Sequence, residues 1–148
     1  MDGLKLLKQD HQRVKEFFEQ CEGSEDKKEQ KQIFKEIKSE LEVDARIEET
    51  IFYPAMEEHE DLRDIVLESL EEHKQMKSLL REMSKLSPSS EKFKPKCKVL
   101  KDDVEHHAEE EEEEKMFPKI RKLINSSELE QLGEKLEAAK HKRLRKAS

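Results

Sequence analysis

With 148 residues, the chain has the length of one domain, and its 32% hydrophobic and 45% charged residues allow only a narrow core. A net charge of -7 argues against nucleic acid as a partner, and no apolar run is long enough to span a membrane. The charged N-terminal segment excludes a signal peptide, and two cysteines are too few for a disulfide scaffold, so we expect a reduced, cytoplasmic setting.

Apolar residues at helical spacing, with few glycines and prolines, predict an all-α fold. The first predicted helix covers about residues 3–21, and His11 falls within its apolar stripe. The second covers about residues 25–58, where Asp44 and Glu48 stand at positions that the pattern gives to apolar side chains. Polar residues inside an apolar stripe are therefore a feature of both helices.

The next two predicted helices repeat this feature. The third covers about residues 61–86 and carries His73 in its stripe. The fourth covers about residues 91–125, and its stripe passes through His107 and Glu111. Beyond this point the apolar residues continue one position out of phase, which indicates an irregular helical turn.

A short fifth helix is predicted over about residues 127–146, after an Asn-Ser-Ser helix stop. Its basic run, residues 140–146, is the one cationic exception in an acidic chain. We interpret this run as a cationic helix C-terminus that complements the helix dipole.

One segment of the chain occurs twice in similar form. Residues 44–54 return as residues 106–118, and each copy has a metal-capable residue, a carboxylate about one turn later, an apolar pair and a helix-stopping proline. Residues i and i+4 lie on one helix face, so each copy can present two ligands to the same centre. The first copy ends at Pro54, where we expect a kink.

A buried carboxylate is neutralised, paired or bound to metal, and no lysine or arginine is evident on the predicted core faces. Four helices that each offer inward nitrogen or oxygen ligands describe a carboxylate-bridged dinuclear site in a bundle core. Imidazole with carboxylate suits iron, manganese or zinc. The candidate ligands are His11, Asp44, Glu48, His73, His107 and either Glu111 or Glu112.

Other residues of the same types are expected to lie outside the site. A lone histidine in a stripe is usually a packing residue, and a glutamate run is usually a solvated face, so only the combination across four helices indicates a metal. We expect no metal at His59, His106 or His141, and we expect Tyr53, Cys21 and Cys97 to pack, with a place for Tyr53 beside the ligands as the alternative.

At these residues the chain resembles the hemerythrin-like, HHE cation-binding family, whose pattern is a helix-1 histidine, HxxxE on helix 2, a histidine on helix 3 and HxxxE or HxxxxD on helix 4. The resemblance covers about residues 4–124. It implies a single domain, residues 1–148, built as an up-down-up-down four-helix bundle at about residues 3–125 with the fifth helix appended. It also implies two non-haem iron ions and O2, peroxide or NO as the small ligand.

Two departures from the family pattern bear on the site. Asp44 stands where the helix-2 histidine belongs; it is a shorter, anionic ligand, which would favour the ferric state over reversible oxygenation, or else it fails to bind metal. His107 lies one residue further from its proline than the pattern expects. A π-bulge would absorb that residue and make Glu112 the equivalent of Glu48, whereas a regular helix makes Glu111 the ligand.

Three functions remain open from the sequence. The first is a di-iron protein that binds or senses a gas, or that acts as an oxidase, peroxidase or catalase. The second is iron storage or sensing, with the acidic run as a metal entry path. The third is a metal-free helical interaction module. A sensor would need an output module, which a protein partner could supply.

Overall fold

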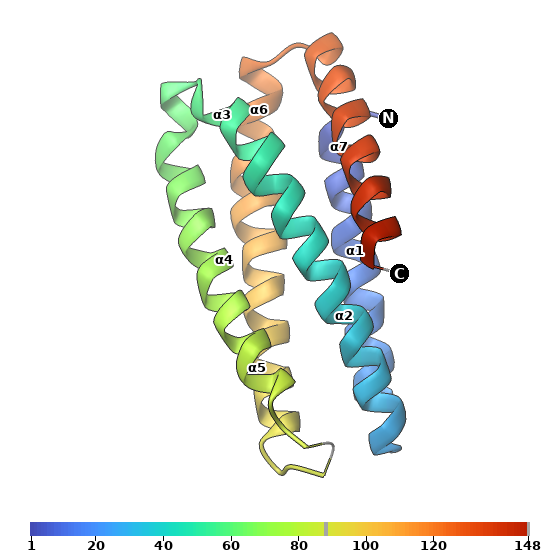
Figure 1. Cartoon of the computed structure of the whole chain (residues 1–148). Coiled ribbons are helices and arrows are strands. Elements are labelled where there is room, and N and C mark those ends of the chain that lie inside the picture. The colour runs from blue at the N-terminus through green and yellow to red at the C-terminus, as the bar shows by residue number, and fades with distance from the viewer. Residues whose placement is uncertain (88, 148) are drawn as a thin grey trace.

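Four long helical rods stand side by side and run alternately up and down, and a fifth helix lies along the outside of the bundle (Figure 1). This computed structural model describes residues 1–87 and 89–147, and that part of the chain contains no strand. The all-α bundle with a fifth helix is therefore confirmed. Its segments are α1 (Gly3–Gly23), α2 (Lys27–Ile47), η1 (Glu48–Phe52), α3 (Tyr53–Glu57), η2 (Glu60–Leu62), α4 (Arg63–Ser84), α5 (Phe93–Glu105), η3 (His106–Met116), α6 (Phe117–Leu123) and α7 (Ser126–Ala147).

Two of the rods contain a π-helical segment. In the second rod η1 joins α2 to α3, and in the fourth rod η3 joins α5 to α6. A proline follows each π segment in the first turn of the next α-helix, and the wider π turn gives the proline ring room against the preceding turn. The irregular turn predicted from the phase slip in the fourth helix is confirmed. For η1 the sequence predicted only the kink expected at Pro54, and the helix continues through that residue as α3.

Side-chain caps fix where three helices begin. The Asp2 carboxylate accepts a hydrogen bond from the Lys5 backbone N–H at 2.9 Å at the start of α1, and Asp26 does the same for α2. Asn125 accepts from the Glu128 N–H at 2.9 Å and so starts α7. Each cap satisfies one of the backbone donors that a helix N-terminus leaves free.

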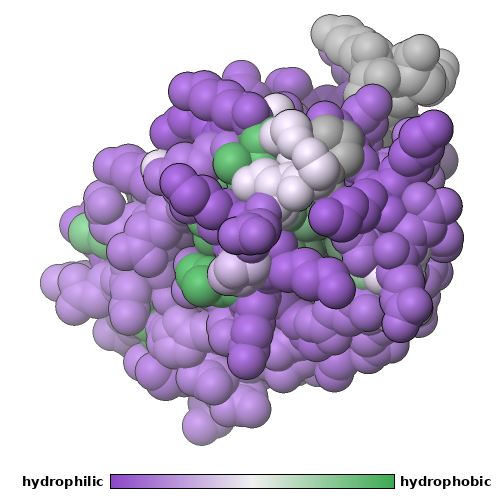
Figure 2. Space-filling view, turned by 90° about the horizontal axis from the view of Figure 1, so that it is seen from below, coloured by the Kyte–Doolittle hydropathy of each residue, from purple (hydrophilic) through white to green (hydrophobic). Residues whose placement is uncertain are grey.

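The core is divided into two apolar clusters with a polar layer between them. The upper core gathers around Leu7, Phe52, Met56 and Phe117. The lower core lies towards the loop that follows α4. Its buried residues include Val14, Phe18, Phe34, Ile37, Leu80 and Leu100. Seen from below, the bundle end is mainly hydrophilic with small hydrophobic patches (Figure 2), as expected when most apolar residues are inside. The polar layer lies where the sequence places its inward histidines and carboxylates.

Helix α7 packs against α1 and α2, and its Leu132 and Leu136 complete the upper core. Gly133 allows the close approach, because a Cβ there would lie 2.0 Å from the Met1 carbonyl oxygen. The interpretation of residues 140–146 as a cationic helix end is wrong for Lys140, which is buried beside acidic residues of α1 and α2. With 22 residues, α7 is as long as α4. None of the described helices is both long and apolar enough to cross a membrane.

Candidate metal centre

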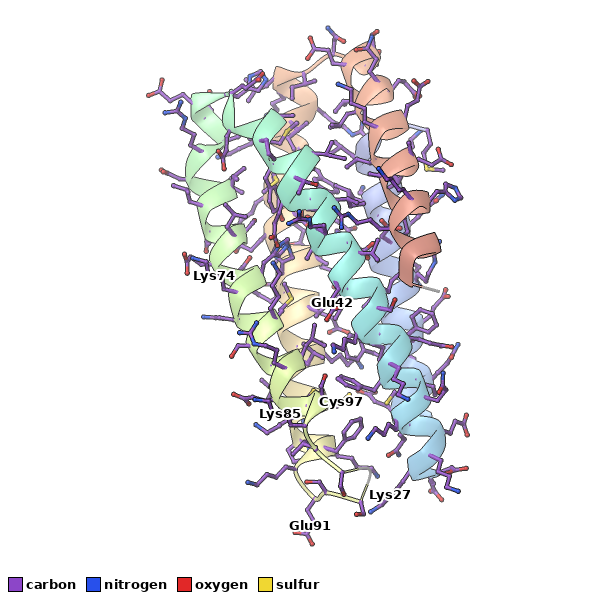
Figure 3. All side chains as sticks on the ribbon, in the orientation of Figure 1. Lys27, Glu42, Lys74, Lys85, Glu91 and Cys97 are labelled. Carbon is purple, nitrogen blue, oxygen red and sulfur yellow. The ribbon has the colours of Figure 1, made fainter. Side chains whose placement is uncertain are left out.

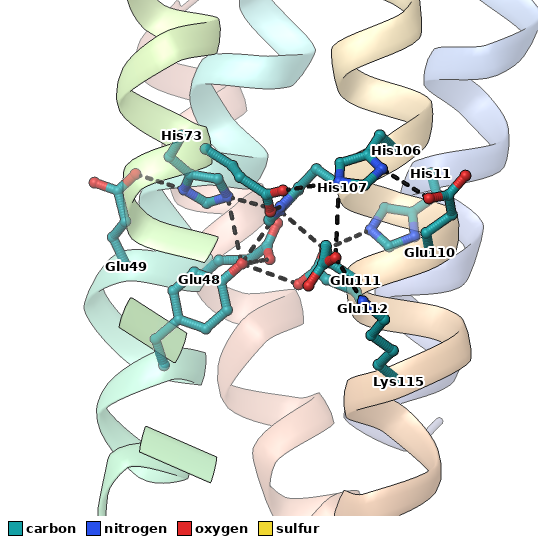
Figure 4. A network of polar contacts seen from close by, with 12 residues as sticks. His11, Glu48, Glu49, His73, His106, His107, Glu110, Glu111, Glu112 and Lys115 are labelled. Atoms are coloured by element: carbon teal, nitrogen blue, oxygen red, sulfur yellow. Dashed lines mark hydrogen bonds and ion pairs between the residues drawn. The ribbon is translucent and has the colours of Figure 1, made fainter. Parts of the chain in front are cut away.

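Ligand-type side chains from all four rods meet in the polar layer (Figure 4). One group consists of Glu48, His73 and His107, and a second consists of His11, Glu48 and Glu112. Within each group the nitrogen and oxygen atoms lie within 4.8 Å of one another. Because Glu48 belongs to both groups, the arrangement has the form of two adjacent cation positions that share a carboxylate.

The contacts inside the centre are short. The Nε2 atoms of His73 and His107 are 3.0 Å apart, and His107 Nε2 lies 3.3 Å from a Glu112 oxygen. His11 Nε2 lies 3.0 Å from the same Glu112 oxygen. Glu112 is fully buried, so this carboxylate, like that of Glu48, is sheltered from bulk water. The imidazole nitrogens and carboxylate oxygens thus converge on one small volume.

Each of the three inward histidines is held by an acidic residue on its outer side. Nδ1 of His73 lies 2.8 Å from a Glu49 oxygen, and Nδ1 of His107 lies 2.8 Å from a Glu72 oxygen. The third pair has the same form, with 2.7 Å between Nδ1 of His11 and Glu113. A carboxylate on Nδ1 fixes the ring orientation and leaves Nε2 for a metal, which is the usual arrangement of metal-bound histidine.

Tyr53 takes the alternative place that the sequence left open for it, beside the ligands. Its hydroxyl donates to Glu48 at 2.7 Å and lies 3.0 Å from Glu112. The same oxygen is 3.3 Å from the Nε2 atoms of both His73 and His107. Burial, followed by the charge of Glu112, raises the Tyr53 pKa well above its usual range, so the hydroxyl keeps its proton.

Bound protons balance the charges of the centre. Burial opposes the charged form of His11, but hydrogen bonds to Glu112 and Glu113 raise its pKa to about 10. Burial likewise opposes the charge on His107, and the Glu112 carboxylate raises the pKa of this imidazole to about 9. Burial raises the pKa of Glu48, with Glu112 adding to the effect. A cation can replace these protons, so the donor set fits a metal that releases protons on binding.

Asp44 is placed differently from the other predicted ligands. Its carboxylate groups with Asp10 and Glu40, and Lys140 Nζ lies 3.7 Å from its Oδ1 atom. The core faces of the four rods were expected to carry no compensating lysine or arginine; a cation comes instead from α7, whose Lys140 also contacts Asp10 and lies 3.0 Å from Glu40. Oδ1 of Asp44 has no hydrogen-bond partner among the described residues.

Glu111 and Glu112, the two alternative ligands of the fourth helix, lie in different surroundings. The π segment η3 brings Glu112 to the centre, in register with Glu48, while Glu111 lies beside it. Glu111 is buried but pairs with Lys115 at 3.0 Å and lies 3.7 Å from His106. His106 is half exposed and lies outside the centre.

A small cavity of about 40 Å³ adjoins the centre on the side of the lower core. His11, Glu48 and His73 contribute to its polar wall, and Asp44 also borders it. The apolar part of its lining includes Val14, Met76, Leu80 and Val104. Its size suits a water molecule or a diatomic molecule next to the ligand atoms.

Sequence reasoning missed the outer carboxylates Glu49, Glu72 and Glu113 and the buried Lys140. Glu49 and Glu72 directly neighbour Glu48 and His73 in the sequence, so adjacency to a candidate ligand was an available signal. The Glu49 pKa is lowered to about 2, first by the His73 hydrogen bond and then by Lys77. No comparable signal singled out Lys140 within a run of basic residues.

Fold and site together define a helical-bundle protein of the cation-binding type. The family model "Hemerythrin HHE cation binding domain" matches residues 2–120, and the chain belongs to this family. A solved structure described as a hemerythrin HHE cation binding domain-containing protein, the Rv2633c homolog from Mycobacterium kansasii, superposes with a TM-score of 0.82 at 27% identity. The match covers 97% of this chain and 87% of that one.

A curated relative is a protein named "DNA nickase" from Nostoc sp. (strain PCC 7120 / SAG 25.82 / UTEX 2576), which is 31% identical over 137 residues. The alignment covers 93% of this chain and 38% of the relative, so the chain spans well under half of that protein's length. The expectation that this chain binds no nucleic acid gains no support from this relative and stays a prediction.

Proposed function

We propose that the chain holds two iron ions between its helices and uses them to bind or react with O2, peroxide or NO. His73 and His107 would hold one ion, His11 would hold the other, and Glu48 and Glu112 would bridge them. The observation that carries the proposal is that all three histidines are fixed at Nδ1 by a glutamate, with Nε2 turned to the centre. Manganese or zinc would fit the same donor types.

The small cavity supports a small ligand rather than a large substrate. Its volume of about 40 Å³ leaves room for one or two heavy atoms beside the histidine and glutamate side chains. The apolar wall formed by residues such as Val14 and Met76 limits the entry of water. Bound iron supplies the redox chemistry, and the chain supplies position, burial and protons.

The proton inventory favours reaction over reversible carriage. Tyr53 donates to Glu48, and its raised pKa keeps a proton beside the centre even when a cation has replaced the protons of His11 and His107. Reduction of O2 or peroxide consumes protons, whereas reversible binding of O2 does not require them. An oxidase, peroxidase or catalase-like role is therefore the form of the proposal that we favour, with a gas sensor as its alternative.

Asp44 remains a proposed ligand, but its carboxylate also faces Lys140. It borders the same cavity as His11 and Glu48, but Lys140 Nζ lies 3.7 Å from its Oδ1 atom, and burial and the charge of Asp10 raise its pKa well above the usual range. Asp44 would bind a cation only by sharing its carboxylate with that ammonium group. We therefore propose five principal ligands and treat Asp44 as a terminal sixth. Glu111, which pairs with Lys115, is not in the proposed set.

The test is the metal content and near-ultraviolet spectrum of protein from iron-replete cells, before and after peroxide. We expect about two irons per chain and ferric absorption that changes with peroxide. The double variant H73A/H107A should lose most of the iron, whereas H141A, on the exposed side of α7, should keep it. A folded chain with no bound metal, or H73A/H107A with unchanged iron, would overturn the proposal.

A further inference from the structure

Two thiols lie together at the opposite end of the molecule from the upper core. Cys21, near the end of α1, and Cys97, in α5, are both free and both buried in the lower core. Figure 3 shows Cys97 at this end of the bundle, near the loop that bears Glu91. Neither thiol is among the groups that form the candidate metal centre.

Cys21 and Cys97 belong to the same apolar cluster and line the same cavity, and the Cys21 thiol donates to the Gln30 carbonyl at 3.8 Å. A hydrogen bond from Cys97 stabilises a Cys21 thiolate and lowers the Cys21 pKa, although burial works against it. The same hydrogen bond, together with burial, raises the pKa of Cys97. The pair is therefore unequal, with Cys21 the better nucleophile and Cys97 the better proton donor.

A surface cavity of about 210 Å³ borders both cysteines. Cys21 and Cys97 form part of its wall, together with Phe93 and the exposed residues Lys94 and Lys98. Glu22 also lines the cavity but pairs with Lys101 at 3.1 Å, so the two lysines leave the lining with a net positive charge, which favours a thiolate inside. A cavity of this volume admits a molecule the size of hydrogen peroxide.

We propose that Cys21 and Cys97 form a redox-active dithiol that a hydroperoxide converts into a disulfide linking α1 to α5. The Cys21 sulfur attacks one peroxide oxygen; an S–O bond forms, the O–O bond breaks, and the other oxygen leaves as water after taking a proton. The Cys97 sulfur then attacks the Cys21 sulfenic acid; the S–S bond forms, the S–O bond breaks, and a second water leaves. The two sulfur atoms lose two electrons in total, and the peroxide gains them.

The disulfide would change the bundle because it joins the first and the last of the four rods. It closes a chain loop that includes α2, η1 and α4, so it restricts the unfolded chain and stabilises the fold. In a reducing compartment the bond would be transient and would report exposure to peroxide. This role is independent of the metal centre, since all of its atoms lie in the lower core.

The test uses the full chain after reduction and removal of metal with a chelator, so that it does not depend on the proposed function. After one equivalent of hydrogen peroxide, thiols are counted by maleimide labelling under denaturing conditions, and the cross-linked peptide is identified by mass spectrometry. We expect both thiols to be lost together, an intact mass lower by two hydrogen atoms, and a higher thermal midpoint that reverts with dithiothreitol.

Matched single variants separate the two roles. C97S should stop at a Cys21 sulfenic acid that dimedone traps, and C21S should react at least about tenfold more slowly, because Cys97 has no donor to stabilise its thiolate. Retention of both thiols in the wild-type chain would overturn the proposal. So would oxidation to sulfinic acids without a cross-link, or a disulfide found only between two chains.

Discussion

The repeated segments, residues 44–54 and 106–118, reach the centre in the same way and differ one turn earlier. In each, the residue before the proline donates its backbone N–H five residues back, from Tyr53 to the Glu48 carbonyl and from Phe117 to the Glu112 carbonyl. This shared π turn places both glutamates at the centre. The local hydrogen-bond pattern of the π turn therefore sets the position of Glu48 and Glu112 in both segments.

One turn earlier, the surroundings of His107 and Asp44 depend on residues of other helices and not on the local hydrogen-bond pattern. His107 is turned to the centre, with Glu72 fixing its ring. Asp44 is grouped instead with Asp10 and faces Lys140. Burial and the charge of Asp10 raise the Asp44 pKa well above its usual range, and Lys140 from α7 opposes this rise, so residues of other helices determine the surroundings of Asp44.

The residues before the two prolines differ as well. Tyr53 brings a hydroxyl donor to the centre, whereas Phe117 stacks on His11 with ring centroids 6.3 Å apart and meets Phe52 edge-on. The first segment thus contributes a proton, and the second contributes an apolar wall. The same turn carries two different chemical roles.

The largest expected effect is loss of a shared glutamate. Glu112→Ala removes the carboxylate that contacts His11, His107 and Tyr53, so metal affinity should fall by at least about 100-fold. Glu111→Ala is the matched control, because Glu111 pairs with Lys115 and should leave metal content close to wild type. Metal analysis after dialysis against a weak chelator measures both. The reverse ranking would show that the π turn does not select the ligand.

The next effect concerns the cation that faces Asp44. Lys140→Met leaves the Asp10, Glu40 and Asp44 carboxylates buried without this partner, and the free energy of unfolding should fall by about 3–5 kcal/mol. Lys142→Met, on the exposed side of the same helix, should change it by less than about 0.5 kcal/mol. Urea unfolding of both variants makes the comparison. Equal stability would mean that Lys140 does not balance these acids.

The stability of the metal-free chain should depend on pH, because His11 and His107 carry extra protons in the folded state. The folded pKa values of His11 and His107 are raised to about 10 and about 9, above their ordinary value of 6.5. Their stabilisation is full below pH 6.5 and is lost as pH rises towards 10. The thermal midpoint of the metal-free chain should therefore fall over this window, and bound metal should suppress the fall. A flat profile for the metal-free chain would contradict the protonation of both imidazoles.

The smallest effect comes from making the two segments alike. Tyr53→Phe gives the first segment the residue type that Phe117 supplies in the second, and it removes the donor to Glu48. We expect a loss of about 1–2 kcal/mol in unfolding free energy, with metal stoichiometry unchanged and the ferric spectrum shifted. If stability and spectrum both match the wild type, Tyr53 has a packing role only. Loss of metal would instead place its hydroxyl among the ligands.

The sequence predicted the rods because helical periodicity is a local property. The second helix was expected over about residues 25–58 and is observed as a continuous rod from Lys27 to Glu57. The one-residue phase slip similarly predicted the π segment η3, since an inserted residue must be absorbed within one helix. Glu48, His73 and His107 could be placed on inward faces for the same reason, and the structure brings them together. Their assignment as metal ligands remains a proposal.

The sequence by itself determined which residues face inward, because that depends on spacing along one helix. Only the tertiary structure decided what each inward residue meets, because partners come from other helices at large sequence separations. Glu113 reaches His11, Lys140 approaches Asp44, and Cys97 lines the same cavity as Cys21 only when distant segments pack. The pairing of buried charges and thiols is set by packing geometry, which leaves no periodic signal in the chain.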